Sequence, residues 1–397
     1  MPDELLIAGA TLLTPRQRLE SAWLLARDGR IAALGQGAAP ELAPAAERID
    51  ARGLLVAPGL IDIHIHGGGG ADTMDAKADA LRMIARSQAA GGTTAWVATT
   101  VTASLADTRR AAEVAMALVG QSLGGAQLLG VHLEGPYLCP EQRGAHDPAH
   151  IRLPDPADYE ALFALLGPAA QRGGRSRVTA APEMRGALEM GQAMRRAGIQ
   201  GAIGHSNADL DTVRKALASG YAHVTHLYSC NSGLRIDGGY KTPGINEAAL
   251  LFDDLSIELI GDGYHVPPAL IELVVKVKGP DRVCLVTDAI RAAGLGAGRY
   301  RLWHADILVE DGVAKLPDRS KFAGSVCTMG QAVRTAVAAG IRLEQALRMA
   351  GATPARLLGL DHKGELAPGK DADLVFLDSR LYPQRTIVGG RTVFAVA

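Results

Sequence analysis

Two histidines, His64 and His66, stand two residues apart in the run LIDIHIH. Residues two apart on an extended strand point to the same face, so both imidazoles could reach one metal ion. An H-x-H pair is a weak signal by itself, and two histidines satisfied by ordinary hydrogen bonds at a strand end are the alternative. The pair therefore indicates a metal site only if the chain supplies further ligands.

Further candidate ligands end three later apolar runs: Glu134 in LLGVHLEG, His205 in QGAIGHS and His226 in AHVTHLY. A carboxylate at the end of an apolar strand is costly unless it is paired, caps the following turn or binds a metal. Together the three form a His/His/Glu set, and three protein ligands with an open position suffice for a catalytic ion. His64 and His66 could then hold a second ion or strengthen the first.

Asp288, in RVCLVTDA, follows another apolar run. A carboxylate in this position could take a proton from an attacking water molecule and pass it to a leaving nitrogen, which is the role of a general acid and base. A nearby cation would lower its pKa and keep it ionised at neutral pH. The alternative is an aspartate that caps the next helix. We therefore predict a metal-dependent hydrolase that cuts an amide bond.

Eight short apolar runs alternate with segments of helical period, a pattern typical of a parallel sheet built from βα units. The runs are LIDIHIH, TTAWVATT, LLGVHLEG, SRVTAAPE, QGAIGHS, AHVTHLY, SIELIGDG and RVCLVTDA. The candidate ligands and acids fall near the ends of these runs, where the loops of a closed (β/α)8 barrel converge on the active site. We predict such a barrel, a TIM barrel of the α/β class, over residues 58–362.

The two ends of the chain read as short strands separated by glycine and proline turns. Residues 1–57 contain LLIAGATLLT, SAWLLARDGRIAALG and ERIDARGLLVAPG, and residues 363–397 contain GELAPGKDADLVFLD and RTIVGGRTVFAVA. The strands of the tail are too few to form a stable sheet alone. We therefore expect residues 1–57 and 363–397 to pair into one small β-sandwich domain.

The whole chain has the composition of a soluble enzyme, with 397 residues, 48% hydrophobic content, 41 basic and 42 acidic residues. This balance lacks the basic character of nucleic-acid-binding proteins, so no such partner is expected. The N-terminus lacks a basic region followed by an apolar stretch, so no leader is expected. No run is long enough to span a bilayer, and no nucleotide-binding glycine motif is present. Four scattered cysteines favour a reducing compartment, and we expect a cytoplasmic protein without a membrane partner.

The motifs HLEGPY, GHSNA, VTHLY, DGYHV, LVTDA and FAGS occur in this order along the chain. With the entry segment PGLIDIHIHG, they resemble the N-acetylglucosamine-6-phosphate deacetylases of the amidohydrolase superfamily over nearly the whole chain. The resemblance implies hydrolysis of the acetamide of an amino-sugar phosphate, in amino-sugar catabolism, with one or two divalent ions, often zinc. The fourth run lacks the bridging lysine of dihydroorotases and hydantoinases, which favours the deacetylase branch.

The resemblance also assigns roles to individual residues. It implies that Glu134, His205 and His226 are metal ligands and that Asp288 is the catalytic acid and base. It adds His146, in RGAHDP, as a residue that binds the acetamide or sugar and could polarise the carbonyl. It implies finally that His265, in DGYHV, reaches substrate phosphate held mainly by a neighbouring subunit, and hence a homodimer.

The chain departs from the family after His226, where many members have Asn-Ala-Met and a later arginine that clamps the phosphate. Here the sequence continues as Tyr-Ser-Cys-Asn-Ser and then RIDGGYKTPG, so Arg235 or Lys241 could supply the charge, or either could be a solvated loop residue. Further residues expected to bind substrate are Ser229, Cys230, Phe322 and Ala323. Alternatives are another N-acyl substrate, such as N-acetylgalactosamine-6-phosphate or an unphosphorylated sugar, and a non-catalytic scaffold.

Other polar residues in the runs are less informative. His132, two residues before Glu134, could support the metal site or be a hydrogen-bonded core histidine, and the sequence does not decide the role of Glu183. His223 and His304 have no motif support and read as core or surface histidines.

Overall fold

The computed structural model describes residues 4–14, 17–41 and 46–396. Residues 1–3, on which the expectation about a leader rests, and residue 397, the end of the predicted second sandwich segment, lie outside the described residues. The centre of the larger part of the molecule is an eight-stranded parallel sheet, which confirms the predicted barrel strands. In sequence order these strands are β6 (Leu60–Ile65), β9 (Thr93–Thr100), β10 (Gln127–Glu134), β11 (Arg177–Ala180), β12 (Gln200–Ile203), β13 (Tyr221–Val224), β16 (Ser256–Ile260) and β17 (Val283–Val286).

The first and last strands of this sheet meet just beyond the end of β17, which closes it into a barrel. The backbone N–H of Asp288 donates to the carbonyl of His64 at 2.9 Å, and the N–H of His66 donates to the carbonyl of Ala289, also at 2.9 Å. Closure places the carboxyl ends of all eight strands around one opening, as in other (β/α)8 barrels. The candidate residues at those ends are thereby brought to one face of the molecule.

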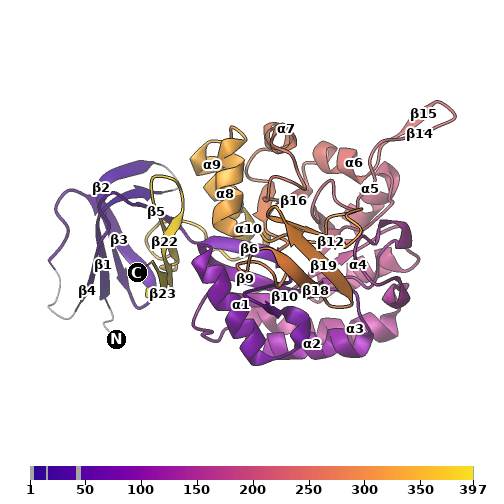
Figure 1. The fold of residues 1–397 in the computed structure, drawn as a ribbon, viewed down its shortest axis with the longest axis horizontal. Helices are drawn as coiled ribbons and strands as arrows, with labels where there is room; N and C mark the ends of the chain where they lie inside the picture. Colours follow the sequence, from indigo (N-terminus) through magenta and orange to yellow (C-terminus); the bar gives the residue numbers. More distant parts are fainter. Residues whose placement is uncertain (1–3, 15–16, 42–45, 397) are drawn as a thin grey trace.

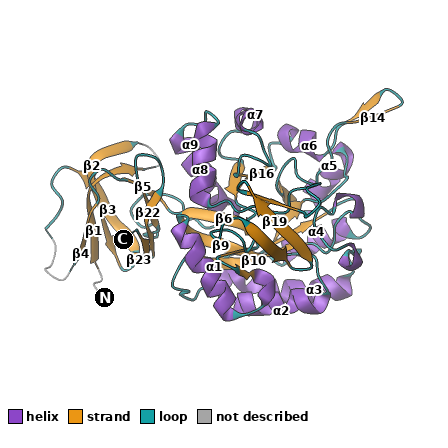
Figure 2. Cartoon of the chain, in the orientation of Figure 1, coloured by secondary structure: helices purple, strands orange, loops and turns teal. Residues whose placement is uncertain are grey.

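Helices surround the barrel strands, and loops connect them on both ends (Figure 1 and Figure 2). Helices follow barrel strands along the chain, as the alternating pattern predicts: α1 (Ala78–Ala90) comes after β6, α2 (Leu105–Leu118) after β9, α4 (Ala187–Arg196) after β11 and α5 (Leu210–Ser219) after β12. The others are α3 (Pro156–Leu166), α6 (Ile245–Leu251), α7 (Pro268–Lys278), α8 (Met329–Ala338), α9 (Leu343–Ala350) and α10 (Ala352–Leu357). The side chains of Ser104 and Asp209 accept from backbone N–H groups in the first turns of α2 and α5, which fixes where these helices begin.

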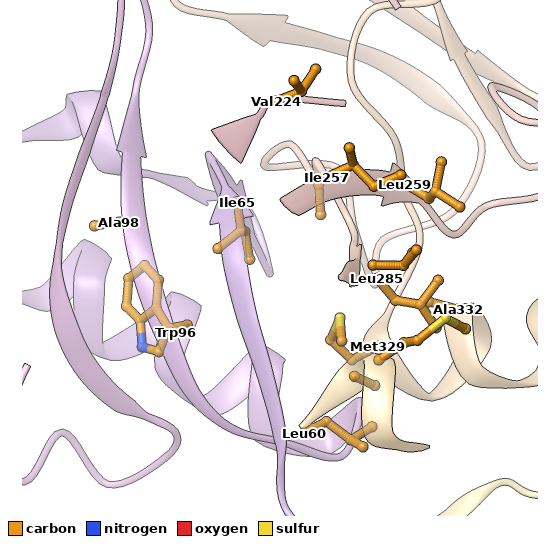
Figure 3. Close-up of a cluster of buried hydrophobic side chains, with 14 of the residues drawn as sticks. Leu60, Ile65, Trp96, Ala98, Val224, Ile257, Leu259, Leu285, Met329 and Ala332 are labelled. Atoms are coloured by element: carbon orange, nitrogen blue, oxygen red, sulfur yellow. The ribbon is translucent and has the colours of Figure 1, made fainter. Parts of the chain in front are cut away.

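Apolar side chains on the outer faces of the strands pack against these helices. In the cluster shown in Figure 3, Trp96 of β9 and Leu285 of β17 are buried together with Met329 of α8. Burial of such side chains stabilises the fold by roughly 1.5–3 kcal/mol each. The barrel is therefore a rigid frame for the polar groups at its strand ends.

The two chain ends form a second, mostly antiparallel sheet of eight strands, as expected for the accessory domain (Figure 1). Its strands are β1 (Glu4–Leu13), β2 (Arg18–Arg27), β3 (Arg30–Gln36), β4 (Glu47–Asp50), β5 (Leu55–Pro58), β21 (Leu374–Leu377), β22 (Pro383–Val388) and β23 (Arg391–Ala395). Antiparallel pairing of β5 with β21 joins the two ends, and Leu12, Leu24 and Phe376 share a separate buried core. Neither end alone would complete this sheet.

Three small antiparallel sheets lie in the loops of the barrel. They are the hairpin β7 (Gly67–Gly68) and β8 (Ala71–Asp72), the hairpin β14 (Arg235–Asp237) and β15 (Tyr240–Thr242), and the sheet β18 (Gly298–Leu302), β19 (Ala305–Glu310) and β20 (Val313–Lys315). The β14–β15 hairpin projects from the end of the barrel farthest from the terminal sheet (Figure 1). None of the helices in the described ranges combines the length and apolar character needed to cross a membrane.

Candidate metal-dependent active site

Glu134, the last residue of β10, lies at the centre of the polar cluster at the barrel opening. Its Oε1 lies 3.1 Å from His205 Nε2, 2.9 Å from His226 Nε2 and 3.3 Å from His64 Nε2, and its Oε2 lies 3.2 Å from His66 Nε2. All five side chains are buried. Two overlapping groups of three could each hold an ion, with Glu134 in both. The structure thus brings together all five predicted ligands.

The hydrogen bonds behind the histidines suit a cation in front of them. His205 Nδ1 lies 2.8 Å from the carbonyl of Gln142, and His226 Nδ1 lies 3.1 Å from the carbonyl of Ser229. A carbonyl oxygen only accepts, so each Nδ1 carries the hydrogen and each neutral imidazole keeps a lone pair on Nε2. Those two Nε2 atoms lie 3.1 Å apart. A divalent ion between them would convert a repulsive contact into two ligand bonds.

The charges in the cluster also favour a bound cation. Burial opposes the charged forms of His64 and His66. The carboxylates of Glu134, Glu258 and Asp288 nevertheless raise the pKa of His64 well above its usual value, and those of Asp288 and Glu134 raise the pKa of His66 to about 9. Burial likewise opposes charge on His205, yet the Cys230 thiol and the Glu134 carboxylate raise its pKa to about 10. The buried cluster therefore calls for positive charge, which one or two metal ions would supply in place of protons.

Asp288 lies beside the ligands but belongs to neither metal-binding group. Its Oδ1 lies 3.2 Å from His66 Nε2 and 3.5 Å from His64 Nε2. Burial alone would raise its pKa, but His64 and His66 hold the pKa below its usual value, so the group is ionised and able to accept a proton. No helix of the described chain begins at Asp288, so the alternative of a helix cap is wrong.

His146 approaches Glu134 from the loop after β10, with its Nε2 3.4 Å from Oε2 of that carboxylate. The backbone N–H of Thr102 donates to His146 Nδ1 at 3.1 Å, so the hydrogen of the neutral ring lies on Nε2. Burial lowers the pKa of His146 to about 4, which keeps the ring neutral. The side chain therefore presents an N–H donor beside the candidate metal ligands.

A cavity of about 650 Å³ opens onto this cluster, and its wall contains six of the residues expected to bind substrate: His146, Ser229, Cys230, His265, Phe322 and Ala323. The ring of His265 is held by a 2.7 Å contact between its Nδ1 and Asp262 Oδ2, and it packs 5.0 Å from the ring of Phe322. The resemblance implied a reach into a neighbouring subunit. In the single chain, the His265 imidazole lies in the wall of its own cavity, and the role across a dimer stays a prediction.

Arg235 and Lys241, the other expected substrate residues, do not line this cavity. Both are exposed and lie on the projecting β14–β15 hairpin, where an Arg235 guanidinium N–H donates to the carbonyl of Asn207 at 3.2 Å. The positive charges of this loop were visible in the sequence, but the direction in which the loop leaves the barrel was not. Instead, the cavity wall contains Arg319, Lys321 and His304, which sequence reasoning passed over.

The residues behind the cluster include two that sequence reasoning missed, Arg177 and Glu258. They form a fully buried ion pair at 2.6 Å. Their signal in the sequence was a charged residue inside an apolar strand run. His132 turns out to be a hydrogen-bonded core histidine, with its ring nitrogens 3.3 Å and 2.7 Å from the hydroxyls of Thr99 and Thr179.

Glu183 lies outside the metal-binding groups and holds the loop after β12. Its carboxylate accepts from Ser206 Oγ and from the backbone N–H of Asn207, both at 2.6 Å. This loop begins at His205, so Glu183 supports the backbone next to a candidate ligand. The structure thus gives it a place that the sequence left open.

Comparison with known proteins identifies the family. A model of the amidohydrolase family matches residues 55–396. The chain is 37% identical to the N-acetylglucosamine-6-phosphate deacetylase of Vibrio furnissii, over 86% of this chain and 83% of that protein. The chain belongs to the amidohydrolase family. Within it, the chain groups with the N-acetylglucosamine-6-phosphate deacetylases and is a hydrolase that acts on an amide bond.

Two further comparisons bear on the branch of this amidohydrolase. It is 36% identical to the N-acetylgalactosamine-6-phosphate deacetylase of Escherichia coli O157:H7, over 96% of this chain and 97% of that protein. It also superposes with a TM-score of 0.89, at 36% identity, on the mutant N-acetyl-D-glucosamine-6-phosphate deacetylase of Mycobacterium smegmatis solved in complex with N-acetyl-D-glucosamine-6-phosphate. That match covers 99% of this chain and 100% of the other. The alternative of a non-catalytic scaffold is left without support.

Proposed function

We propose that this amidohydrolase is a divalent-metal-dependent deacetylase that hydrolyses N-acetylglucosamine-6-phosphate to glucosamine-6-phosphate and acetate. The observation that carries the proposal is the buried cluster of Glu134, His64, His66, His205 and His226 at one end of the cavity, with ionised Asp288 beside it. Deacetylase relatives match this chain over nearly its whole length. We further propose that the ion is zinc, with one or two per subunit, and that the enzyme works in amino-sugar catabolism in the cytoplasm.

When bound, the ion polarises the acetamide carbonyl and makes water more acidic. The reaction adds water to the acetamide carbon and breaks the carbon–nitrogen bond. Asp288 Oδ1 takes a proton from the attacking water and delivers it to the departing nitrogen, so the carboxylate ends the cycle as it began. His146, with its hydrogen on Nε2, donates to the carbonyl oxygen as that oxygen gains negative charge. These assignments agree with the tautomer and the ionisation state described above.

The phosphate of the substrate requires a cation at the end of the cavity away from Glu134. Among the described residues that line the cavity, the lysine and arginine side chains are Arg319 and Lys321. Arg319 contacts both carboxylate oxygens of Glu310, at 2.7 and 3.1 Å, so its charge is already matched. Lys321 makes no ion pair within the described ranges, and we propose that it binds the phosphate from the same subunit.

Arg235 and Lys241 remain phosphate candidates in a different arrangement. Their hairpin projects away from its own cavity, so these side chains would serve a second subunit. This role belongs with the homodimer that the family resemblance implies. If Lys321 binds the phosphate, an isolated subunit can hold it. If Arg235 or Lys241 binds the phosphate, a second subunit is required.

The function is tested by acetate release from N-acetylglucosamine-6-phosphate, N-acetylgalactosamine-6-phosphate and unphosphorylated N-acetylglucosamine, with metal content measured on the same sample. We expect the first substrate to give the highest kcat/KM, with a loss of orders of magnitude when phosphate is absent. A preference for N-acetylgalactosamine-6-phosphate would change the proposed sugar but keep the proposed reaction, which is deacetylation. Release from none of the three by metal-loaded protein would refute the proposal.

The phosphate site is tested by Lys321→Gln beside Lys241→Gln and Arg235→Gln. We expect Lys321→Gln to raise KM for the phosphorylated substrate at least tenfold, because one charge-assisted hydrogen bond is worth about 1.5–3 kcal/mol. Its kcat/KM for the unphosphorylated sugar should not change. A loss confined to the hairpin variants, with a dimer seen by light scattering, would assign the phosphate to the partner subunit instead.

A further inference from the structure

Glu258 is a fully buried carboxylate that lies behind the candidate metal cluster, in the middle of β16. Its Oε1 lies 2.6 Å from the Arg177 guanidinium of β11 and 3.2 Å from His223 Nε2 of β13. Its Oε2 lies 2.9 Å from His64 Nδ1 and 3.2 Å from the backbone N–H of His226. One side chain thus connects four barrel strands or strand ends, and two of its partners are candidate metal ligands.

The negative charge of Glu258 is paired with the positive charge of Arg177. The Arg177 guanidinium, which is always charged, lies 2.6 Å from Oε1, and this contact keeps Glu258 a carboxylate. Burial lowers the pKa of His223 to about 4, and that ring is neutral. Arg177 also donates to the carbonyl of Ile63 at 2.7 Å, next to His64 in the chain. A buried pair of this kind is weak evidence for stability, so stability alone does not account for it.

Glu258 decides which nitrogen of His64 faces the cluster as a lone pair. The ionised carboxylate only accepts, so His64 Nδ1 carries the hydrogen and neutral His64 has a bare Nε2. This Nε2 is buried without a hydrogen bond, 3.3 Å from Glu134 Oε1 and 3.5 Å from Asp288 Oδ1. With the hydrogen on Nε2 instead, His64 would donate to Glu134 and occupy the place of an ion.

No carboxylate accepts a hydrogen bond from the Nδ1 atom of the other candidate histidine ligands in the described ranges. His205 and His226 each face a backbone carbonyl, and His66 Nδ1 is buried without a hydrogen-bond partner in the described part of the chain. Within the group of His64, His66 and Glu134, the carboxylate of Glu258 is therefore the group that orients an imidazole. A carboxylate behind a histidine ligand raises its basicity, and its loss typically costs 10- to 100-fold in metal affinity.

We propose that Glu258, held in place by Arg177, is a positioning residue that keeps His64 in its metal-binding tautomer and thereby determines whether a second divalent ion binds at His64, His66 and Glu134. The inference rests on the metal-dependent function proposed above and adds a residue that controls its ion count. In the group of Glu134, His205 and His226, backbone carbonyls set both ring tautomers, and Glu258 contacts only the backbone N–H of His226. The ion in that group therefore depends far less on this carboxylate.

The test is a zinc titration of metal-free wild-type protein and of Glu258→Gln against a chromophoric chelator, with bound zinc counted by mass spectrometry. We expect two ions in the wild type. In Glu258→Gln, the affinity for one ion should fall about 10- to 100-fold while the other is unchanged. His223→Gln is the matched control, because His223 contacts the same carboxylate and is no candidate ligand; it should keep both ions.

Three results would overturn the inference: one ion in the wild type, unchanged affinities in Glu258→Gln, or equal loss of both ions as expected for Glu134→Ala. If Glu258→Gln fails to fold, the double variant Arg177→Met/Glu258→Met removes both buried charges together, an exchange that proteins often tolerate. It should fold and bind one ion tightly; two tight ions would contradict the proposal. Acetate release is scored separately, so failure of the deacetylase function would be distinguishable from failure of the ion count.

Discussion

Among the candidate metal ligands and the candidate acid and base, three residues hold backbone conformations that side chains with a Cβ rarely adopt. His205, His226 and Asp288 have φ values of 51°, 29° and 49°, each just after a barrel strand ends. Such left-handed residues cost of order 1–3 kcal/mol and persist where the surrounding structure over-determines them. Here the neighbouring backbone holds Asp288, whose carbonyl accepts from the N–H of Ser325 at 2.7 Å. The strain turns the side chains at the strand ends toward Glu134.

Replacing Asp288 by asparagine should separate proton transfer from metal binding. The amide keeps the size of the side chain but cannot take a proton, and Asp288 lies outside both metal-binding groups. We expect kcat to fall about 100- to 10,000-fold with metal content unchanged. Acetate release and elemental analysis on the same sample check this. Full turnover in the variant would remove Asp288 from the mechanism.

Replacing His146 by alanine should remove a donor to the developing oxyanion. The N–H of Thr102 donates to His146 Nδ1, so the hydrogen that the ring offers lies on Nε2, and alanine has no such donor. We expect kcat to fall about 100- to 1,000-fold, with KM changed far less and with metal retained. Steady-state kinetics beside metal analysis decides the matter. A variant with normal kcat and a raised KM would make His146 a residue for ground-state binding only.

The barrel strands pack closely against the segments that connect them, and glycines mark the tightest approaches. Gly174 lies between a short 3-10 helix, η4 (Gly167–Arg172), and β11, with a hydrogen bond from its N–H to the carbonyl of Ala169 at 3.0 Å. A Cβ built there would lie 1.6 Å from the carbonyl oxygen of Leu129 in β10. Because that neighbour is backbone within the barrel sheet, it cannot move aside cheaply.

Gly174→Ala should therefore destabilise the protein, although it lies far along the chain from the candidate ligands. Overpacking of this kind costs typically about 1–3 kcal/mol, and more where backbone must shift. Gly233→Ala is the control, because its Cβ would meet the side-chain nitrogen of Asn246 at 3.3 Å, an atom that can move. Urea unfolding of both variants, followed by circular dichroism, checks the prediction. Equal stability of the two would show that the β10 backbone can yield at this point.

At the scale of the whole molecule, the terminal sheet is fastened to the start of the barrel. The N–H of Gly59, just before β6, donates to the carbonyl of Asp373 at 2.8 Å, and Thr386 Oγ1 of β22 donates to the carbonyl of Ala89 in α1 at 2.7 Å. The Lys363 ammonium is almost fully buried 2.9 Å from Asp371 and 2.7 Å from Asp373. This ion cluster stands where the chain passes from the barrel back to the sheet.

Lys363→Met should destabilise the protein by about 3–5 kcal/mol, because it leaves the Asp373 carboxylate buried without its cation. Burial opposes the charge on Lys363, but Asp373 and Asp371 raise its pKa above the usual value. The stabilisation that the Lys363 ion pairs provide is therefore fully present below the ordinary lysine pKa. It is lost as the pH rises through the raised pKa of Lys363. Urea unfolding at pH 7 measures the full effect. A loss below about 1 kcal/mol would show that water reaches the carboxylates.

The sequence by itself determined the strand runs, the pairing of the chain ends and the residue types of the cluster. Apolar runs of strand length, H-x-H spacing and carboxylates at run ends are local patterns with a direct physical meaning. They predicted that five side chains lie together, and the structure brings them together: His64, His66, Glu134, His205 and His226. The family motifs added His146. These features are readable because each depends on a residue and its near neighbours in the chain.

Only the tertiary structure decided which groups face one another across the barrel. Glu258 lies 194 residues from His64 in the chain, yet their side chains are in contact, and no local pattern connects the two. Likewise, the charges of Arg235 and Lys241 were plain in the sequence, but their hairpin projects out from the barrel and neither side chain lines the cavity, while Lys321 does. Barrel closure and loop direction arise from packing between distant segments, and that packing sets the tautomers, the pKa values and the lining of the site.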